Sequence, residues 1–219
     1  MKEQAHQRYK TKDGVIVPSV TTIISLLNKP ALVPWANKLG LQGIDVAKYV
    51  DKTAEIGTLT HQMILDYFKN IETDFSEYSP ETKDKAENSF LSFLEWKKNK
   101  VIEPILIEKM GVSEGWGFGG TFDFCGIVDK VFTLIDFKTG SGIYPEMSIQ
   151  LAAYKTLVEY DYEISYKIKQ AMILRIPRTE DEKFEIKVWT DLDKQWEIFK
   201  RLLEIYKLQK EIKEVNKNE

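Results

Sequence analysis

The stretch LIDFKTGSG, residues 134–142, restricts what this chain can fold into more than any other. Its first residues alternate between apolar and charged types, and residues two apart in a β-strand share one face. Asp136 and Lys138 therefore lie side by side, while Ile135 and Phe137 point to the opposite face. A strand of this kind has a packed core on one face and charges on the other, and Gly140 ends it.

Composition and length describe an ordinary globular protein. The 219 residues are 43% hydrophobic and 30% charged, enough to bury a sizeable core in one domain spanning residues 1–219. No stretch is apolar for long enough to cross a membrane, and the N-terminal residues lack the apolar core of a secretory signal, so we expect a cytoplasmic protein with no membrane partner. A net charge of −3 does not indicate a surface that binds nucleic acid as a whole, so a polyanion would have to bind in a local groove.

Two classes of cofactor are excluded by what the sequence lacks. The single cysteine, Cys125, rules out an internal disulfide and any zinc or iron–sulfur site that needs several cysteines. The GxxxxGK[ST] pattern of an ATP-binding phosphate loop is also missing, so we expect no ATP-driven motor.

Helical periodicity dominates residues 1–100, after a hairpin signalled by the Asp-Gly pair at positions 13–14. The first expected helix starts at Ser19 or Thr21 and stops at Pro30, and a second begins just after Pro30. A third covers residues 44–70, with a break near Gly57, and a fourth runs from a cap at Ser79 to residue 100. This N-terminal region contains His61.

From residue 101 the pattern changes to short apolar runs separated by turns, which are typical of strands. We expect a meander of three strands over 101–110, 117–129 and 130–140, a helix over 145–160, two strands over 166–176 and 183–189, and a last helix over 192–215. The sheet core spans residues 101–190, and the C-terminal helix spans 191–219. The predicted fold class is therefore α+β, with a central mixed sheet of about five strands flanked by helices.

A second acidic residue is expected beside the charged pair. Asp123 lies in the preceding strand, and the turn near residues 128–130 is short enough to make the two strands antiparallel neighbours, which brings Asp123 towards Asp136. Two carboxylates with a lysine beside them form a hard oxygen site of the kind that Mg²⁺ or Mn²⁺ occupies. The other interpretation is a partly buried ion pair between Asp136 and Lys138, which the spacing alone favours.

Three further polar residues lie on helices. Helical periodicity puts His61 on an apolar face, where it is either a ligand or a satisfied core histidine. Gln150 and Tyr154 are one turn apart on the same helix face, where they could hydrogen-bond a carboxylate or a phosphate, or simply border the core.

Four short motifs occur in order along the chain: GTLTH (57–61), GGTFD (119–123), IDFKTG (135–140) and QLAAY (150–154). Together they resemble the motif series of the RecB-like nucleases of the PD-(D/E)xK superfamily. Residues 17–40 are also similar to the opening of phage-type exonucleases of that group, so the resemblance covers about residues 17–157. It implies a restriction-endonuclease-type α/β/α core and a DNA nuclease, more specifically an exonuclease that works on ends or single strands.

The resemblance also implies a role for each matching residue. The metal ligands would be His61, Asp123, Asp136 and the backbone carbonyl of Phe137, with Glu108 as a further acidic candidate; the catalytic lysine would be Lys138; and Gln150 and Tyr154 would support the site. The chain departs from the family in having no proline before Asp123, and the cysteines of its iron–sulfur relatives are absent. No iron–sulfur cluster is therefore expected.

Phosphodiester hydrolysis needs an activated water, in-line attack and neutralisation of the charge that builds up on phosphate, and one or two Mg²⁺ or Mn²⁺ ions can supply all three. Lys138 would orient the water or stabilise the anion, and it can act as a base only if its pKa falls well below the ordinary value of about 10.4. The implied partners are DNA, as single strands or duplex ends, and a recombination or replication protein. The location would be the host cytoplasm if the chain is phage-encoded.

Nucleic-acid contacts are expected from two groups of residues near the ends of elements. The candidates are the hydroxyls of Ser19, Thr21 and Thr22, the rings of Trp35 and Trp116 for stacking on unpaired bases, and the ammonium groups of Lys29 and Lys38. The alternative is that the hydroxyls cap a helix and that both tryptophans serve packing.

Two other functional interpretations stay open at this point. In the first, a catalytically inactive protein with a nuclease fold binds nucleic acid or a protein partner, and the C-terminal helix is the docking element. An intact set of buried charged residues argues against it, because such a cluster costs stability. In the second, an ordinary α+β protein carries a core ion pair, and the order of the four motifs is due to chance.

Overall fold

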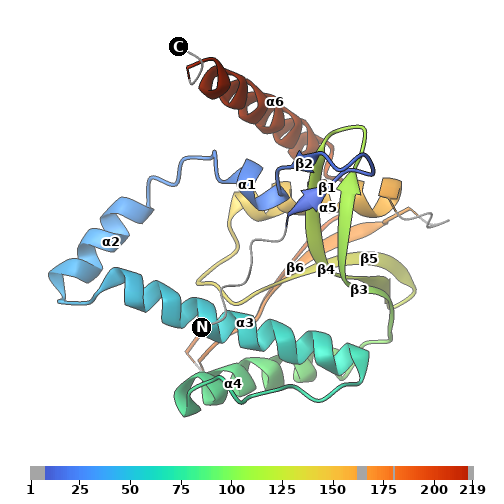
Figure 1. Cartoon of the computed structure of the whole chain (residues 1–219). Helices are drawn as coiled ribbons and strands as arrows, with labels where there is room; N and C mark the ends of the chain where they lie inside the picture. The colour runs from blue at the N-terminus through green and yellow to red at the C-terminus, as the bar shows by residue number, and fades with distance from the viewer. Residues whose placement is uncertain (1–7, 162–166, 180, 217–219) are drawn as a thin grey trace.

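The computed structural model describes residues 8–161 and 167–216, apart from residue 180. Its central sheet consists, in spatial order, of β3 (Ile102–Ser113), β4 (Phe118–Val128), β5 (Val131–Lys138), β6 (Gln170–Arg175) and β7 (Glu185–Trp189). β5 and β6 run parallel, whereas the other neighbouring strands are antiparallel (Figure 1). The predicted α+β class, with a five-stranded mixed sheet flanked by helices, is therefore confirmed.

Helices cover both faces of this sheet and form two cores (Figure 1). They are α1 (Val20–Ile24), α2 (Leu32–Leu41), α3 (Val46–Lys69), α4 (Pro80–Lys97), α5 (Pro145–Asp161) and α6 (Asp193–Val215). The helices α1, α5 and α6 pack on one face, and α3 and α4 pack on the other. Ile135 and Phe137 lie in the second core, as the alternation in the sequence predicts.

The turn between β4 and β5 follows the expected short connection. Val128 pairs with Val131, and the two residues between them, Asp129 and Lys130, have φ values of 49° and 71°. Two positive φ angles in a two-residue loop match the right-handed twist of the flanking strands. The hairpin that precedes the helices is also confirmed, because β1 (Tyr9–Lys10) pairs antiparallel with β2 (Ile16–Val17).

The first helix is shorter than predicted. Ser19 caps it as expected, and its hydroxyl accepts from the Thr22 N–H, but the helix ends at Ile24 and not at Pro30. The Ser25 hydroxyl donates to the Thr22 carbonyl at 2.6 Å, and the next turn closes with tighter i to i+3 bonds. A serine whose hydroxyl bonds a nearby backbone carbonyl competes with helix continuation, so the prediction from the proline alone is wrong.

The helix α3 is longer than predicted because it has no break near Gly57. It runs for 24 residues, from the Asp45 cap to Asn70, which closes it in a left-handed conformation. Glycine inside a helix costs about 1 kcal/mol relative to alanine, and packing of α3 on α4 and the sheet outweighs that cost. The predicted break is wrong, and Gly57 has another use, because the loop after β5 approaches it closely.

The remaining differences concern boundaries and exposure. β3 extends to Ser113, three residues beyond the prediction, because β4 pairs with it as far as Phe118. β6 begins at Gln170, and the expected start at residue 166 lies outside the described residues. α2 buries none of its residues against the rest of the molecule and lies away from the sheet in Figure 1. Of the helices described, none is both long and apolar enough to cross a membrane.

Candidate active site

The charged pair of β5 is in contact, as the two-residue period of the strand predicts. Lys138 Nζ lies 2.7 Å from Asp136 Oδ2, and the Asp136 side chain is 3% exposed. Beyond this ion pair, Asp136 Oδ2 is a buried oxygen with no hydrogen-bond partner within the described part of the chain. Such an oxygen is costly to bury and is available to a ligand that supplies positive charge.

Asp123 reaches the same place from β4. The pairing of β4 with β5 ends at Phe124 and Ile135, and one further step of that register would set Asp123 opposite Asp136. At that point the carboxylate replaces the missing ladder bond, because Asp123 Oδ2 accepts from the Phe137 N–H at 2.8 Å. The two acidic residues therefore occupy neighbouring positions on adjacent strands, as expected.

An irregularity in the sheet explains why the strands part here. The pairing of β3 with β4 skips Glu108 and Asp123, and Glu108 has a positive φ of 49°. Phe122 packs in the core beneath α5, yet Phe124, two residues on, packs in the core beneath α4. The alternation of faces is thus broken at Asp123, which is the kind of local bend that strands use to re-aim a side chain.

His61 approaches from the middle of α3. Its Nδ1 lies 3.8 Å from Asp123 Oδ2, and its ring stands edge-on to the Phe137 ring with centroids 6.1 Å apart. The His61 side chain is 28% exposed, so it borders a solvent-facing space and is not enclosed in the core. The caps at Asp45 and Asn70 fix the length of the helix that holds it there.

Gln150 and Tyr154 lie one turn apart on α5, as predicted, and they contact each other. Gln150 Nε2 donates to the Tyr154 hydroxyl at 2.8 Å. Burial, followed by the negative charge of Asp136, raises the pKa of the Tyr154 hydroxyl well above its ordinary value. Tyr154 is therefore neutral at every physiological pH and lies within electrostatic reach of the acidic pair.

The electrostatics of the acidic pair are set by burial. Burial raises the pKa of Asp136 to about 6, with the Asp123 charge adding to the rise and the Lys138 ammonium opposing it. For Lys138, burial by itself would lower the pKa, but the charges of Asp136 and Asp123 outweigh it and raise that pKa above its ordinary value. Lys138 is therefore a stable cation in this arrangement.

A cleft of about 490 Å³ opens over these residues. Five of the predicted site residues line it: His61, Asp123, Phe137, Lys138 and Glu108. Glu108 stands at its margin, where its carboxylate is paired with Lys69 at 2.5 Å. Asp136 lies in contact with Lys138 and is not itself part of the cleft wall.

The cleft also includes polar residues that sequence reasoning missed. They are Thr58, Gln62, Thr121 and Thr139. Thr58 is three residues before His61 on α3, and Thr121 is two residues before Asp123 on β4, so the periods of helix and strand could have found these two. Gln62 directly follows His61, and adjacent residues of a helix do not share a face, so the period gave no signal for it. Thr139 directly follows Lys138 in the IDFKTG motif, and Gln62 donates to Asp66 at 2.6 Å.

The donor types at the cleft fit a hard divalent cation. Carboxylate oxygens, a backbone carbonyl and one imidazole are ligands that Mg²⁺ and Mn²⁺ accept, and the buried Asp136 Oδ2 has a free lone pair. Among the residues the structure describes, however, no three His, Cys, Asp or Glu side chains already stand together as a metal-binding group. Asp136 would have to exchange its contact with Lys138 for one with the cation.

The hydroxyl candidates for nucleic-acid contact form a helix cap. The Ser19 hydroxyl lies 2.9 Å from that of Thr21 and 2.7 Å from that of Thr22, and it accepts from the Thr22 backbone N–H at 3.0 Å. Lys29 is ion-paired with Glu146 at 3.0 Å. None of these residues is part of the cleft wall as far as the structure describes it.

The aromatic candidates lie on two different parts of the surface. Trp35, on α2, meets the Tyr49 ring edge-on at 6.1 Å and stays 38% exposed, with Lys38 in the last turn of the same helix. Trp116, in the turn between β3 and β4, packs edge-on against Trp196 of α6 at 5.3 Å. Neither ring lines the cleft in the described part of the chain, so their contact with nucleic acid stays a prediction.

Comparisons with known proteins add little to this geometry. No model of a known protein family matches the sequence, and no curated protein matches it. A candidate exonuclease from Eubacterium rectale resembles the fold with a TM-score of 0.43 at 13% identity, over 68% of this chain and 66% of that one, just under two thirds of its length. An alkaline exonuclease from Laribacter hongkongensis has a TM-score of 0.41 at 11% identity, over 76% of this chain and 90% of that one. Because both scores are low, the class of the site must be argued from its own residues.

Proposed function

We propose that this chain is a metal-dependent deoxyribonuclease, and more specifically an exonuclease of the RecB-like type. One observation carries the proposal: His61, Asp123 and Lys138, which three separate motifs supply, line a single cleft, and Asp136 is in contact with Lys138 there. A structural ion pair would explain the contact of Asp136 with Lys138 but would not require the other two residues to face the same solvent-filled space.

In this proposal Mg²⁺ or Mn²⁺ supplies the charge that activates water and neutralises the phosphate. Asp136, Asp123 and His61 would hold the ion together with the Phe137 carbonyl, and the buried Oδ2 of Asp136 supports this assignment because it lacks a hydrogen bond among the described residues. Glu108, at the margin of the cleft, would be an additional acidic group near the substrate.

Lys138 would act as a positive charge beside the scissile phosphate. Its raised pKa supports this role over that of a general base, because a base would need a lowered pKa. Tyr154 would stay protonated and, held by Gln150, would offer its hydroxyl to the acidic pair.

The proposed substrate is DNA with ends or single-stranded segments. Ser19, Thr21, Thr22, Trp35, Lys38 and Trp116 would contact the strand outside the cleft, and a recombination or replication protein would be the partner in the cytoplasm. These contacts follow from the residue types and their places in the chain, and they are separate from the proposal for the cleft itself.

The test is cleavage of end-labelled single- and double-stranded DNA by the purified protein with Mg²⁺, with Mn²⁺ and with a chelator. We expect cleavage that needs the metal. In Asp136→Asn and in Lys138→Met we expect the rate of cleavage to fall at least about a hundredfold, because removing one electrostatic group from an active site costs a loss of that order. Asp129→Asn is the matched control, because Asp129 also pairs with a lysine but lies at the far end of β5. A covalently closed circular substrate separates exonuclease from endonuclease action.

The outcomes separate the three interpretations. Metal-dependent cutting that survives in Asp129→Asn and disappears in Asp136→Asn supports the nuclease. Tight DNA binding without cutting, under every metal, supports an inactive nuclease-fold protein. Neither binding nor cutting leaves an α+β protein with a structural ion pair.

A further inference from the structure

The loop after β5 forms part of the cleft, and the four sequence motifs do not explain what holds it. Thr139 and Gly140 follow Lys138 directly and line the cleft next to it. A loop at this place needs support, because its backbone has left the β5–β6 ladder, whose last bond runs from the Ile176 N–H to the Lys138 carbonyl at 2.7 Å.

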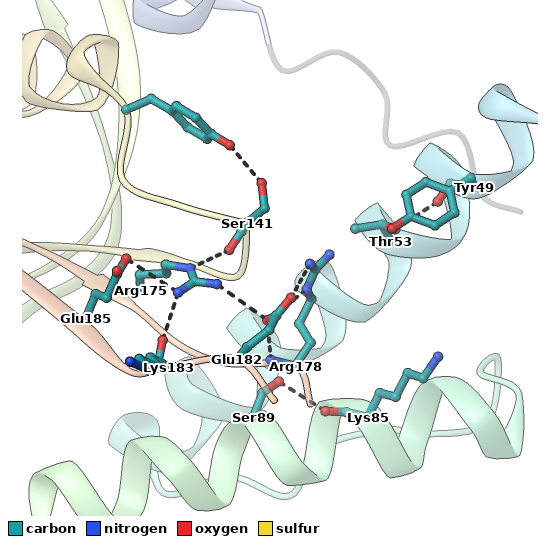
Figure 2. Close-up of polar contacts among 12 residues, drawn as sticks. Tyr49, Thr53, Lys85, Ser89, Ser141, Arg175, Arg178, Glu182, Lys183 and Glu185 are labelled. Carbon is teal, nitrogen blue, oxygen red and sulfur yellow. Dashed lines mark hydrogen bonds and ion pairs between the residues drawn. The ribbon is translucent and has the colours of Figure 1, made fainter. Parts of the chain in front are cut away.

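Arg175 supplies a direct contact to this loop. It is the last residue of β6 and stands opposite Lys138 in the parallel register of β5 and β6. Its Nε donates to the Gly140 carbonyl at 2.8 Å, and its Nη1 donates to the Lys183 carbonyl at 2.9 Å (Figure 2). The planar guanidinium therefore ties the cleft loop to the turn between β6 and β7.

The Arg175 guanidinium is buried, and two glutamate carboxylates, from Glu182 and Glu185, balance its positive charge. The Arg175 residue is 6% exposed, with Glu185 Oε2 3.4 Å from Nη1 and Glu182 Oε2 3.8 Å from Nη2. Glu182 is itself held by Arg178, whose Nη2 and backbone N–H donate to it at 2.6 and 2.9 Å. Figure 2 shows these groups connected in one network. Because the network holds the guanidinium from several sides, it fixes the direction in which the Arg175 Nε–H points.

The loop is also confined from the opposite side, by α3. A Cβ atom added at Gly57 would lie 2.6 Å from Thr139 Oγ1, closer than two such atoms can approach. Gly57 therefore allows Thr139 to pack directly on the helix that carries His61. The first two loop residues lie between the backbone of α3 and the side chain of Arg175.

We propose that Arg175 is a positioning residue of the cleft: through its hydrogen bond to the Gly140 carbonyl it holds the Thr139–Gly140 segment in place beside Lys138. Arg175 does not touch the cleft itself, so it acts only through the loop. A mere anchor for the β6–β7 turn would need the bond to Lys183 but not the bond to Gly140. The consequence for catalysis rests on the proposed nuclease function, whereas the effect on the loop does not.

The experiment compares Arg175→Lys with Arg178→Lys. An ammonium group keeps the charge at either position but cannot donate to two acceptors in the fork geometry of a guanidinium. Arg178 is the matched control, because it is a partly buried arginine that binds Glu182 without touching Gly140. Two quantities are measured: amide hydrogen exchange of a peptide covering residues 139–144 and the steady-state constants for DNA cleavage.

We expect exchange of the loop peptide to become about tenfold faster in Arg175→Lys, as the loss of one charged hydrogen bond implies. In Arg178→Lys we expect a much smaller change, about twofold at most, because Arg178 reaches Arg175 only through Glu182, whose Oε2 lies 3.8 Å from the guanidinium. We expect kcat to fall about ten- to a hundredfold in Arg175→Lys with a smaller change in KM, because a misplaced group costs rate more than binding. Equal effects of the two substitutions, or an unchanged loop in Arg175→Lys, would overturn the proposal.

A milder variant covers the case in which Arg175→Lys does not fold. Glu185→Gln removes one partner of the guanidinium from a side chain that is 47% exposed and leaves the bond to Gly140 intact. We expect the exchange rate of the same peptide to rise about two- to threefold, which is less than the rise expected for Arg175→Lys because the hydrogen bond to Gly140 remains. An unchanged exchange rate in this variant would contradict the proposed role of Arg175. If the wild-type protein cuts no DNA with any metal, the nuclease proposal fails, and the exchange data decide the role of Arg175 alone.

Discussion

Two aspartate–lysine pairs stand at opposite ends of β5, and they differ in almost everything except chemistry. At the turn before the strand, Lys100 Nζ lies 2.9 Å from Asp129 Oδ2, with side chains that are 35% and 44% exposed. At the cleft end, Lys138 and Asp136 are 2.7 Å apart, with side chains that are 22% and 3% exposed. The comparison isolates the effect of burial on the same two functional groups.

Burial reverses the direction of the pKa shift. The hydrogen bond from Lys100, together with the Val101 N–H, lowers the pKa of the exposed Asp129. The same kind of partner fails to do so for Asp136, because loss of water raises its pKa to about 6. An exposed pair contributes little to stability and a buried one can cost more than it returns. Functional sites commonly contain a charged group whose burial beside a cleft lowers the stability of the fold and shifts the pKa of that group.

The largest expected difference between the two pairs is in stability. Lys138→Met leaves the buried Asp136 carboxylate without its cation, so we expect a loss of about 3–5 kcal/mol in the free energy of unfolding at pH 8. Lys100→Met removes an exposed partner and should cost less than about 1 kcal/mol. Urea unfolding of the three proteins measures both values. Equal losses in the two variants would contradict the comparison.

The second difference is the sign of the pH dependence. Asp136 holds its proton more tightly in the folded protein, where its pKa is about 6 against an ordinary value of 3.8, so the folded state binds more protons between these pH values. Stability therefore falls as pH rises through this window, by roughly 2–3 kcal/mol for this group. Asp129 acts in the opposite sense. Because its pKa is lowered in the folded protein, it adds to the stability of the folded state above about pH 4, and this stabilisation is lost as pH falls.

Unfolding at pH 4, 5, 6 and 7 tests this sign. We expect the stability of Asp136→Asn, relative to the wild-type protein, to rise between pH 4 and 6, because this variant lacks the decline that Asp136 contributes. Asp129→Asn should retain that contribution. A difference in stability between Asp136→Asn and the wild-type protein that stays constant over this range would contradict the prediction.

The smallest expected difference concerns metal binding. A cation that binds only the folded protein raises the free energy of unfolding by about 1.4 kcal/mol at ten times its dissociation constant. We expect Mn²⁺ to stabilise the wild-type protein and Asp129→Asn equally and to have no effect on Asp136→Asn. Thermal unfolding with and without Mn²⁺ measures the effect, and paramagnetic resonance of free Mn²⁺ checks the binding. Stabilisation of Asp136→Asn to the same extent would place the ion elsewhere.

Local patterns in the sequence predicted a large part of the fold and of the site. The period of β5 put Asp136 beside Lys138, and the period of α5 put Gln150 beside Tyr154; both contacts are present. The caps at Ser19 and Ser79 are also where the sequence placed them. These features succeed because they depend on residues within one turn or one strand of each other.

The wrong predictions have a common cause. Gly57 was expected to break α3 and Pro30 to end α1, because each residue type is a local helix breaker or stop. At Gly57 the packing of a 24-residue helix outweighs a small local cost, and the missing side chain makes room for Thr139. At α1 the Ser25 hydroxyl ends the helix before the proline is reached.

The sequence by itself determined where most of the helices and strands lie and the pairing of charges along β5, since these follow from repeats of 2 or 3.6 residues. It also determined the order of strands within the meander, because short turns join neighbouring antiparallel strands. Only the tertiary structure decided that Asp136 is buried, that Asp123 bonds the Phe137 backbone where two strands part, and that Arg175 holds the loop beside Lys138. The physical reason is that burial and strand divergence depend on groups far apart in the chain, and solvent exclusion, not residue type, sets the energy of a charge.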